Sequence, residues 1–265
     1  MRADLEEFYS ELVAWWRRRS SGERMALAFS GGRDSLLLGA SAVEAKCAPE
    51  LLFLRTRARV RDEKTSWKAA EALGLSLRQV VVTEERLLEI VRGYGNLLRK
   101  QEDYTGRILA VCEVALAEAA SGRALVTGHG PEAVFGGFRR RPVPRNDEER
   151  LEILEKNVRR LESVSVATGV PILRPFHEEK FQKYFLRLRE EGRDRIEALP
   201  NWLAVPPQPS LKSSLQNGSG LHYLFRKWAK RNGFRYVRDG MEALLQEGET
   251  GVACAVVEAA RRRAG

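Results

Sequence analysis

The sequence has few cysteines and no long apolar run. Its three cysteines, Cys47, Cys112 and Cys254, lie far apart and form no CxxC pair, so we expect neither a disulfide framework nor a cysteine-rich metal or iron–sulfur site. No stretch approaches the roughly 18 consecutive apolar residues of a membrane span. The first residues carry acids where a signal peptide is basic and then apolar. These absences favour a reducing, cytoplasmic location and exclude a membrane partner.

Acidic residues are outnumbered by basic ones. Lys and Arg total 45 against 36 Asp and Glu, so the chain of 265 residues carries a net charge of +9. Such a balance favours anionic partners such as nucleotides, phosphates or RNA. A high charged fraction with few Cys and Met is also typical of heat-adapted proteins, so surface ion pairs explain part of the arginine content.

Apolar runs alternate with helical patterns along the first half of the chain. We expect strands at 25–30, 50–56, 77–83 and 123–128, with helices between them. Nearly continuous apolar strands in such an alternation are typical of a parallel sheet that is covered on both faces. The expected fold class is therefore α/β, a doubly wound parallel sheet with a mostly helical C-terminal half.

The composition of the sequence changes near residue 140, where a charged stretch that prolines interrupt begins. We expect an N-terminal helix (1–22), an α/β core (23–140) and a mostly helical half (141–265) in which only "PILRPF" and "FRYV" look extended. Residues 199–220 are rich in Pro, Gly and Ser, which predicts a long ordered loop or a lid. Helices are expected from the first strand to about 45, and at 62–73, 84–99, 105–120, 147–167, 177–198, 221–232 and 239–263.

The first strand runs directly into the turn "SGGRDS", residues 30–35, and then into a helix. Backbone N–H groups and the positive end of a helix meet at such a turn, which predicts an anion there. The turn lacks the lysine of a Walker A loop, so that class of site is excluded. The carboxylate of Asp34 would lie beside a phosphate of the same charge only if Mg²⁺ bridges the two. The alternative is that Asp34 caps an ordinary tight turn. The residues that we expect to hold phosphate are Ser30, Gly31, Gly32 and Ser35.

"SGGRDS" resembles the S-G-G-x-D-S pyrophosphate loop of the PP-loop ATP pyrophosphatases. The resemblance implies an adenine nucleotide α-hydrolase-like fold and cleavage of ATP between its α- and β-phosphates. In this family AMP is transferred to a carbonyl or carboxyl oxygen, and a nucleophile then displaces it. The family includes the asparagine, GMP, NAD and argininosuccinate synthetases and several tRNA-modifying enzymes.

A second match, "VTGHGPEAVFGGF", resembles the G-E-G-x-D-E-x-F-G-G-Y signature of the asparagine synthetase branch. Gly128 and Gly130 match and are expected at the nucleotide. Glu132 replaces the family's Asp, which implies a second carboxylate for Mg²⁺ beside Asp34. His129 replaces a Glu that contacts the reacting end of the substrate, so it is a candidate base. The same residues fit a dinucleotide-binding G-x-G-x-x-A pattern, but no strand with a ribose-binding acid follows.

A third match, "RRLESVSVATGVPILRPFHEEK", resembles the family's R-x-x-x-M-A-x-G-x-E-x-R-x-P-F-L-D segment. Pro171 and Leu173 stand where the family has Glu and Arg. Farther on, Lys212 in "LKSSLQ" resembles the lysine of K-x-x-L-R, which stabilises charge as the amide forms. A plain solvated lysine in a proline-rich loop is the alternative.

The resemblance implies an ATP- and Mg²⁺-dependent, AMP-forming amide ligase that acts on a small-molecule carboxylate and an amine. The chain reaches the ATP loop by residue 30, so we expect no glutaminase domain before it. The amine is then free ammonia, ammonia from a separate subunit, or a larger amine. The sequence leaves open whether the chain forms a homodimer.

Two other functions remain open. The net charge favours a tRNA-modifying enzyme that adenylates a base, although the missing CxxC and the second match make RNA the less favoured partner. The basic run 139–141 is predicted at the rim of the cleft, where it would hold an acidic substrate or an RNA phosphate. The substitutions at His129, Pro171 and Leu173 suggest instead an ATP-binding subunit that has lost its ligase chemistry.

Overall fold

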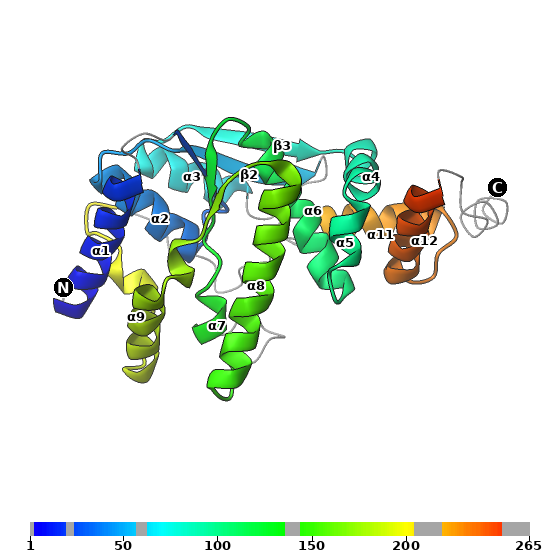
Figure 1. The fold of residues 1–265 in the computed structure, drawn as a ribbon. Helices are drawn as coiled ribbons and strands as arrows, with labels where there is room; N and C mark the ends of the chain where they lie inside the picture. The colour runs from blue at the N-terminus through cyan, green and yellow to red at the C-terminus, as the bar shows by residue number, and fades with distance from the viewer. Residues whose placement is uncertain (1–2, 20–23, 57–62, 136–143, 204–218, 251–265) are drawn as a thin grey trace.

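The computed structural model describes residues 3–19, 24–56, 63–135, 144–203 and 219–250 (Figure 1). Lys212, the basic run 139–141 and Cys254 lie outside this part of the chain. The strands are β1 (Met25–Ala28), β2 (Glu50–Thr56), β3 (Leu77–Val82), β4 (Ala124–Val126) and β5 (Ile172–Leu173). The helices are α1 (Ala3–Arg19), α2 (Arg33–Glu44), α3 (Glu63–Leu73), α4 (Glu84–Gly93), α5 (Gly95–Arg99), α6 (Tyr104–Ala119), α7 (Glu132–Phe135), α8 (Asp147–Thr168), α9 (Glu179–Glu190), α11 (Leu221–Arg231) and α12 (Val237–Thr250), with the short 3₁₀ helices η1 (Pro175–His177) and η2 (Arg195–Ala198).

The five strands form one parallel sheet in the order β3-β2-β1-β4-β5. The chain adds β2 and β3 on one side of β1, and then β4 and β5 on the other side. The order therefore reverses between β1 and β4, and ligands of such sheets bind outside the carboxyl ends of the strands at this reversal. The topology confirms the expected doubly wound α/β fold.

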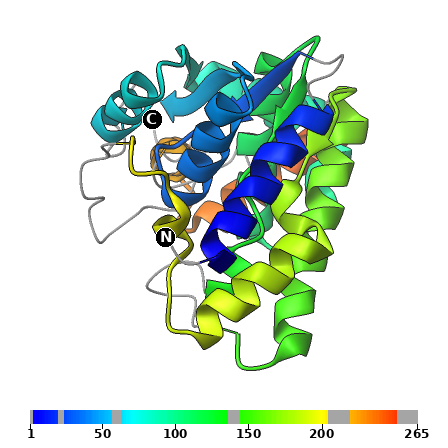
Figure 2. The ribbon, with the colours of Figure 1, turned by 90° about the vertical axis from the view of Figure 1, so that its left-hand side faces the viewer.

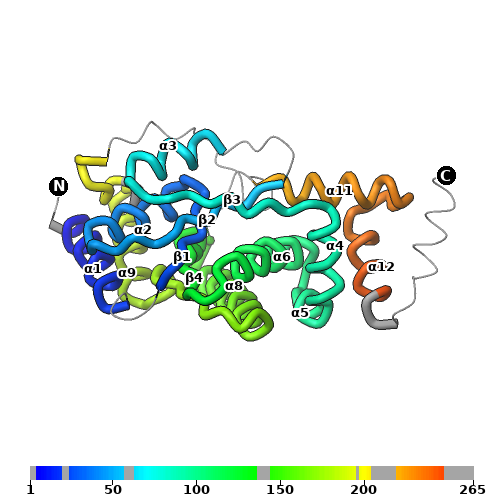
Figure 3. The backbone as a smooth tube through the Cα atoms, turned by 90° about the horizontal axis from the view of Figure 1, so that it is seen from above, coloured from blue at the N-terminus to red at the C-terminus, as the bar shows by residue number. Residues whose placement is uncertain are grey.

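Both faces of the sheet are covered, which explains why the strands are apolar at nearly every position. Within β1, Leu27 belongs to the core cluster under α1, α2 and α9, whereas Ala26 belongs to the cluster under α4, α6 and α11. Figure 3 shows α1, α2 and α9 on one side of the strands and α6, α8 and α12 on the other. Neighbouring residues thus point to opposite cores, as the pleat of a strand requires.

Helix α1 packs its apolar stripe beside α2 and α9 (Figure 2). Phe8, Leu12 and Trp16 are fully buried. The indole Nε1 of Trp16 donates to the Ser41 hydroxyl of α2 at 3.1 Å, and that of Trp15 donates to Glu178 Oε1 at 2.6 Å. The helix is therefore tied to the layer that covers one face of the sheet.

Three local expectations were wrong, and glycines explain two of them. The helix expected at 84–99 breaks into α4 and α5 around Gly93 and Gly95, where the low helix propensity of glycine favours an interruption. The helix expected at 177–198 ends at Glu190, because Gly192 takes a φ of +67°. "FRYV" forms no strand, since Phe234 stacks on Trp228 of α11 instead.

None of the helices in the described part of the chain is long and apolar enough to cross a membrane.

Candidate nucleotide and acceptor site

The glycine turn joins the carboxyl end of β1 to the first turn of α2. Gly31 has a φ of +65°, and a Cβ atom there would lie 2.9 Å from the Ser66 Cα of α3. Glycine is thus required both by the backbone conformation and by the close approach of α3. Gly32 is extended and precedes α2 without a side-chain cap. The turn therefore presents the positive end of α2 to the carboxyl edge of the sheet.

The two serines of the turn hold it together. Ser35 Oγ donates to the carbonyl of Gly32 at 3.0 Å, and it accepts from the Ser30 N–H at 3.4 Å. Ser30 Oγ accepts from the Gly32 N–H at 3.3 Å. These bonds fix the shape of the turn before a ligand arrives, and the hydroxyls expected to bind phosphate belong to this internal set.

The second motif packs against the glycine turn. A Cβ atom on Gly128, just beyond β4, would lie 3.2 Å from the Asp34 Cβ and 3.4 Å from the Ser35 backbone nitrogen. Only a residue without a side chain allows this approach without movement. The strand order explains the contact, because β1 and β4 are neighbours and their carboxyl ends share one edge.

The third motif lies against the second. Gly130 has a φ of +127°, and a Cβ atom there would come within 2.8 Å of the Phe176 carbonyl oxygen. The same oxygen accepts a 2.5 Å hydrogen bond from Gln182 Nε2. The three motifs that the sequence spreads over 30–176 thus meet outside β1, β4 and β5.

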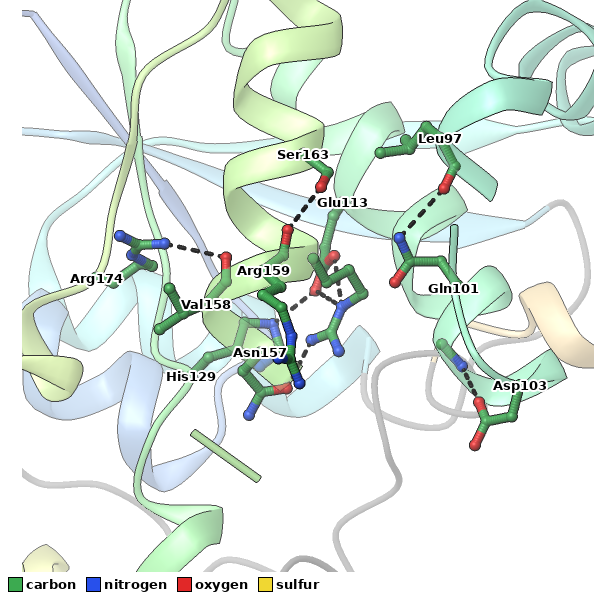
Figure 4. A network of polar contacts seen from close by, with 12 residues as sticks. Leu97, Gln101, Asp103, Glu113, His129, Asn157, Val158, Arg159, Ser163 and Arg174 are labelled. Atoms are coloured by element: carbon green, nitrogen blue, oxygen red, sulfur yellow. Dashed lines mark hydrogen bonds and ion pairs between the residues drawn. The ribbon is translucent and has the colours of Figure 1, made fainter. Parts of the chain in front are cut away.

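His129 lies between two carboxylates, those of Glu113 and Glu132. Figure 4 shows His129 and Glu113 in a polar network beside α8. The Nε2 atom of His129 is 3.2 Å from Glu113 Oε1, and its Nδ1 is 3.7 Å from Glu132 Oε1. Glu113 comes from α6 and is only 2% exposed, whereas His129 and Glu132 are partly accessible.

Two residues of α8 complete this network. Arg160 Nε donates to both Glu113 oxygens at 3.0 and 2.9 Å, and its Nη2 donates to Asn157 Oδ1 at 2.9 Å. Asn157 Nδ2 in turn donates to Glu132 Oε1 at 2.7 Å. We call Glu113, His129, Glu132, Asn157 and Arg160 the acceptor network. Two carboxylates balance Arg160 and a protonated His129, so the charges of the network sum to zero.

The acceptor network favours the protonated form of His129. Burial lowers the pKa of His129, but hydrogen bonds to Glu113 and Glu132 and the charges of these carboxylates outweigh it and raise the pKa to about 9. Burial raises the pKa of Glu132, yet the bond and charge of His129 bring it below its usual range. At neutral pH the imidazole is therefore a fixed cation, a form unsuited to the base role predicted from the sequence.

The two carboxylates predicted for Mg²⁺ differ in their surroundings. Both oxygens of Glu132 accept hydrogen bonds inside the protein, one from the Gly130 N–H at 2.8 Å and one from Asn157. Asp34 lies in the first turn of α2, against Gly128. The described residues contain no group of three or more His, Cys, Asp or Glu side chains that could hold a metal ion. The arrangement fits Mg²⁺ held chiefly by phosphates and one carboxylate, Asp34, and argues against the metal role predicted for Glu132.

Sequence reasoning missed Glu113, Asn157 and Arg160. Each carries a signal, because each is a polar residue on the buried face of an otherwise apolar helix stripe. Pro171 and Leu173, which stand where the motif of the third match has Glu and Arg, use their carbonyls to pair β5 with the β4 segment. The Leu125 and Thr127 N–H groups donate to these carbonyls at 2.8 and 3.0 Å.

No protein-family model matches the sequence, and the curated proteins contain no significant match. Many solved structures resemble the chain, among them the following three. NMN synthetase from Francisella tularensis has 15% identity and a TM-score of 0.39, and the match covers 77% of this chain and 99% of that one. A predicted subunit of tRNA methyltransferase from Methanocaldococcus jannaschii has 14% identity, a TM-score of 0.38 and coverage of 72% and 99%. NH3-dependent NAD synthetase from Campylobacter jejuni has 10% identity, a TM-score of 0.37 and coverage of 92% and 95%. Likenesses at this level carry no argument about activity, and the fold class rests on the strand order.

Proposed function

We propose that the chain is an ATP- and Mg²⁺-dependent, AMP-forming carbon–nitrogen ligase that resembles the synthetase domain of asparagine synthetases. A substrate carboxylate would attack the α-phosphate of ATP, so that pyrophosphate leaves and an acyl-adenylate forms. Ammonia or another amine would then attack the acyl carbon, and AMP would leave with the bonding electrons.

One observation carries this proposal: Gly128 of the second motif lies against Asp34 and Ser35 of the first. The pyrophosphate loop and the segment expected to face the reacting substrate thus share one edge of the sheet. The reversal of strand order at β1 and β4 is also where ligands of this fold class bind.

The proposed roles follow from these positions. The positive end of α2 and the glycine turn that precedes it would hold the pyrophosphate. Asp34 would fix Mg²⁺, which when bound neutralises phosphate charge. Lys212, outside the described residues, is proposed to stabilise the acyl transfer. His129, held protonated, would place positive charge beside the acceptor and fix the turn from Gly128 to Gly130.

The test is pyrophosphate release with ATP, Mg²⁺, ammonia and a panel of small carboxylates. Asp34→Asn keeps the size of the side chain and removes its charge, so release should fall at least about 100-fold. Asp147→Asn, at the largely exposed start of α8, is the matched control and should keep full activity. Unchanged release in the Asp34 variant would contradict the proposed role.

A second function, an ATP-binding subunit without ligase chemistry, is favoured by the acceptor network itself. Its carboxylates are satisfied inside the protein, and Pro171 and Leu173 serve the sheet. Saturable ATP binding without pyrophosphate release for any carboxylate and amine would support this function. Release that depends on one carboxylate would exclude it.

A further inference from the structure

His177 is a partly buried histidine that the proposed chemistry does not use. It ends η1, directly after Phe176, whose carbonyl lies under Gly130. Both of its ring nitrogens are buried, and neither has a hydrogen-bond partner among the residues that the structure describes. Buried polar groups in native proteins are nearly always hydrogen-bonded, so this imidazole needs a partner from outside that part of the chain.

The surroundings keep this imidazole neutral. Burial lowers the pKa of His177 to about 4, and the charges of His129, Arg174 and Arg160 act in the same direction, while Glu132 opposes them. A neutral imidazole has one N–H donor and one acceptor nitrogen. A partner must therefore be able to accept one hydrogen bond or donate one. An uncharged partner meets this requirement.

His177 also lines a cavity of about 290 Å³ on the flank of α8. Leu151, Leu154 and Val158 provide an apolar wall, and Leu151 is 49% exposed. Glu155 and Arg159 also line it; they are largely exposed, with their charged groups 3.8 Å apart. The two opposite charges offset each other, so the cavity favours neither an anion nor a cation.

The ring nitrogens are covered in the orientation described. A half-turn of the ring about the Cβ–Cγ bond exchanges each nitrogen with a ring carbon while the ring keeps its plane. Such a turn would bring a nitrogen to any part of the cavity wall that a ring carbon now forms. The unmet hydrogen bonds favour the turn once a partner is present.

We propose that this cavity is a binding site for a small uncharged molecule with an apolar chain and a hydroxyl or primary-amide end, with His177 as its hydrogen-bonding partner. The apolar chain lies along Leu151, Leu154 and Val158. This site stands whether or not the chain is a ligase. Binding also reaches the acceptor network, because η1 packs under the turn that carries His129.

The test uses the intact chain with ¹⁵N-labelled histidine, since only three histidines occur, His129, His177 and His222. Butyramide is the probe, and butyrate and butylammonium are charged controls of similar size. We expect butyramide to shift the His177 nitrogen signals saturably, with a dissociation constant on the order of 1 mM. A smaller shift at His129 and none at His222 should accompany it.

Two variants separate binding at this site from general effects. His177→Phe removes both nitrogens, and Leu154→Phe fills the cavity while leaving the imidazole. Each should weaken butyramide binding about tenfold or more. Glu152→Gln, on the exposed side of the same helix, should bind as the unchanged protein does.

Three results would overturn the proposal. Equal shifts with butyrate or butylammonium would show that the site does not select uncharged molecules. Unchanged affinity in both phenylalanine variants would place the binding elsewhere. A crystal structure grown with saturating butyramide that shows only ordered water on His177 would assign the nitrogens to water.

Discussion

Glu113 is the acidic residue among the buried positions of α6. A carboxylate in such a place is tolerated only when paired charges and hydrogen bonds replace its water. Arg160 supplies two bonds to it, and His129 supplies a third. The pairing makes the acceptor network depend on Glu113, because its loss would leave Arg160 buried without a counter-charge.

We predict that Glu113→Gln lowers the free energy of unfolding by about 3 kcal/mol, since it keeps the shape of the side chain and removes its charge. Urea denaturation measures this change. Glu152→Gln removes a carboxylate from an exposed ion pair with Lys156 and should leave stability unchanged within error. A change below about 1 kcal/mol for Glu113→Gln would show that the pairing is not needed for stability.

Gly128 gives a second prediction at the scale of one residue. Gly128→Ala places a methyl group 3.2 Å from the Asp34 Cβ, so the two motifs must separate slightly. We expect a loss of stability of about 1 kcal/mol and a loss of ATP affinity of about tenfold, because Asp34 and Ser35 belong to the glycine turn that we propose to hold the pyrophosphate.

Gly93→Ala is the matched control for this substitution. A Cβ atom on Gly93 meets nothing within 4 Å, and its φ is not in the left-handed region. Alanine there should keep or slightly raise stability and leave ATP binding unchanged. Denaturation and calorimetric ATP titration of both variants measure the difference. Equal ATP affinity in the two variants would show that Gly128 is not part of the ATP site.

At the scale of elements, local sequence patterns predicted the sheet well. β2 runs over Glu50–Thr56, as expected, because its apolar residues are consecutive and Pro49 and polar residues bound them. A nucleotide role for Gly128 and Gly130 stays a prediction; the structure shows that a Cβ atom at either position would crowd a neighbouring segment.

Contacts between distant elements explain what the sequence could not predict. The bond between Glu113 and Arg160 joins residues 47 positions apart, and no local pattern encodes it. The four-residue helix α7 is too short for a periodic signal. No sequence pattern marks His177, because its missing hydrogen-bond partner among the described residues is a property of the packed η1 segment and not of its sequence.

The burial of the His177 ring nitrogens in η1 predicts that the stability of the fold depends on pH. The pKa of His177 lies near 4 in the folded chain, below its ordinary value of 6.5. The native state therefore binds fewer protons than the unfolded state between these values. The contribution of His177 to the free energy of unfolding is fully present above about pH 6.5. It is lost as the pH falls toward 4, by up to about 3 kcal/mol.

His177→Phe isolates this effect from the protonation of carboxylates. Between pH 7 and pH 4 the unchanged protein should lose up to about 3 kcal/mol more stability than the variant does. Above pH 7 the difference between the two should be constant. Denaturant titrations at several pH values provide the measurement, and parallel pH profiles would show that His177 is not kept neutral by burial.

At the scale of the whole molecule, opposite charges balance part of the positive charge. Glu50 lies beside Arg78 and Arg123, and Glu118 beside Arg86. Arg160 is neutralised inside the acceptor network. These arginines form ion pairs between elements. Part of the arginine content is therefore explained by stabilising ion pairs, as the composition suggested.

The net charge of +9 still attracts polyanions, so we predict weak, non-specific RNA binding. The dissociation constant for tRNA should lie near 10⁻⁴ to 10⁻⁶ M at physiological salt and rise steeply with salt concentration. An unrelated RNA of equal length should bind equally well, because charge alone drives the association. Fluorescence anisotropy at several salt concentrations measures both. A preference for tRNA of about 100-fold or more would require contacts beyond charge, and would favour the tRNA-modifying function over the small-molecule ligase.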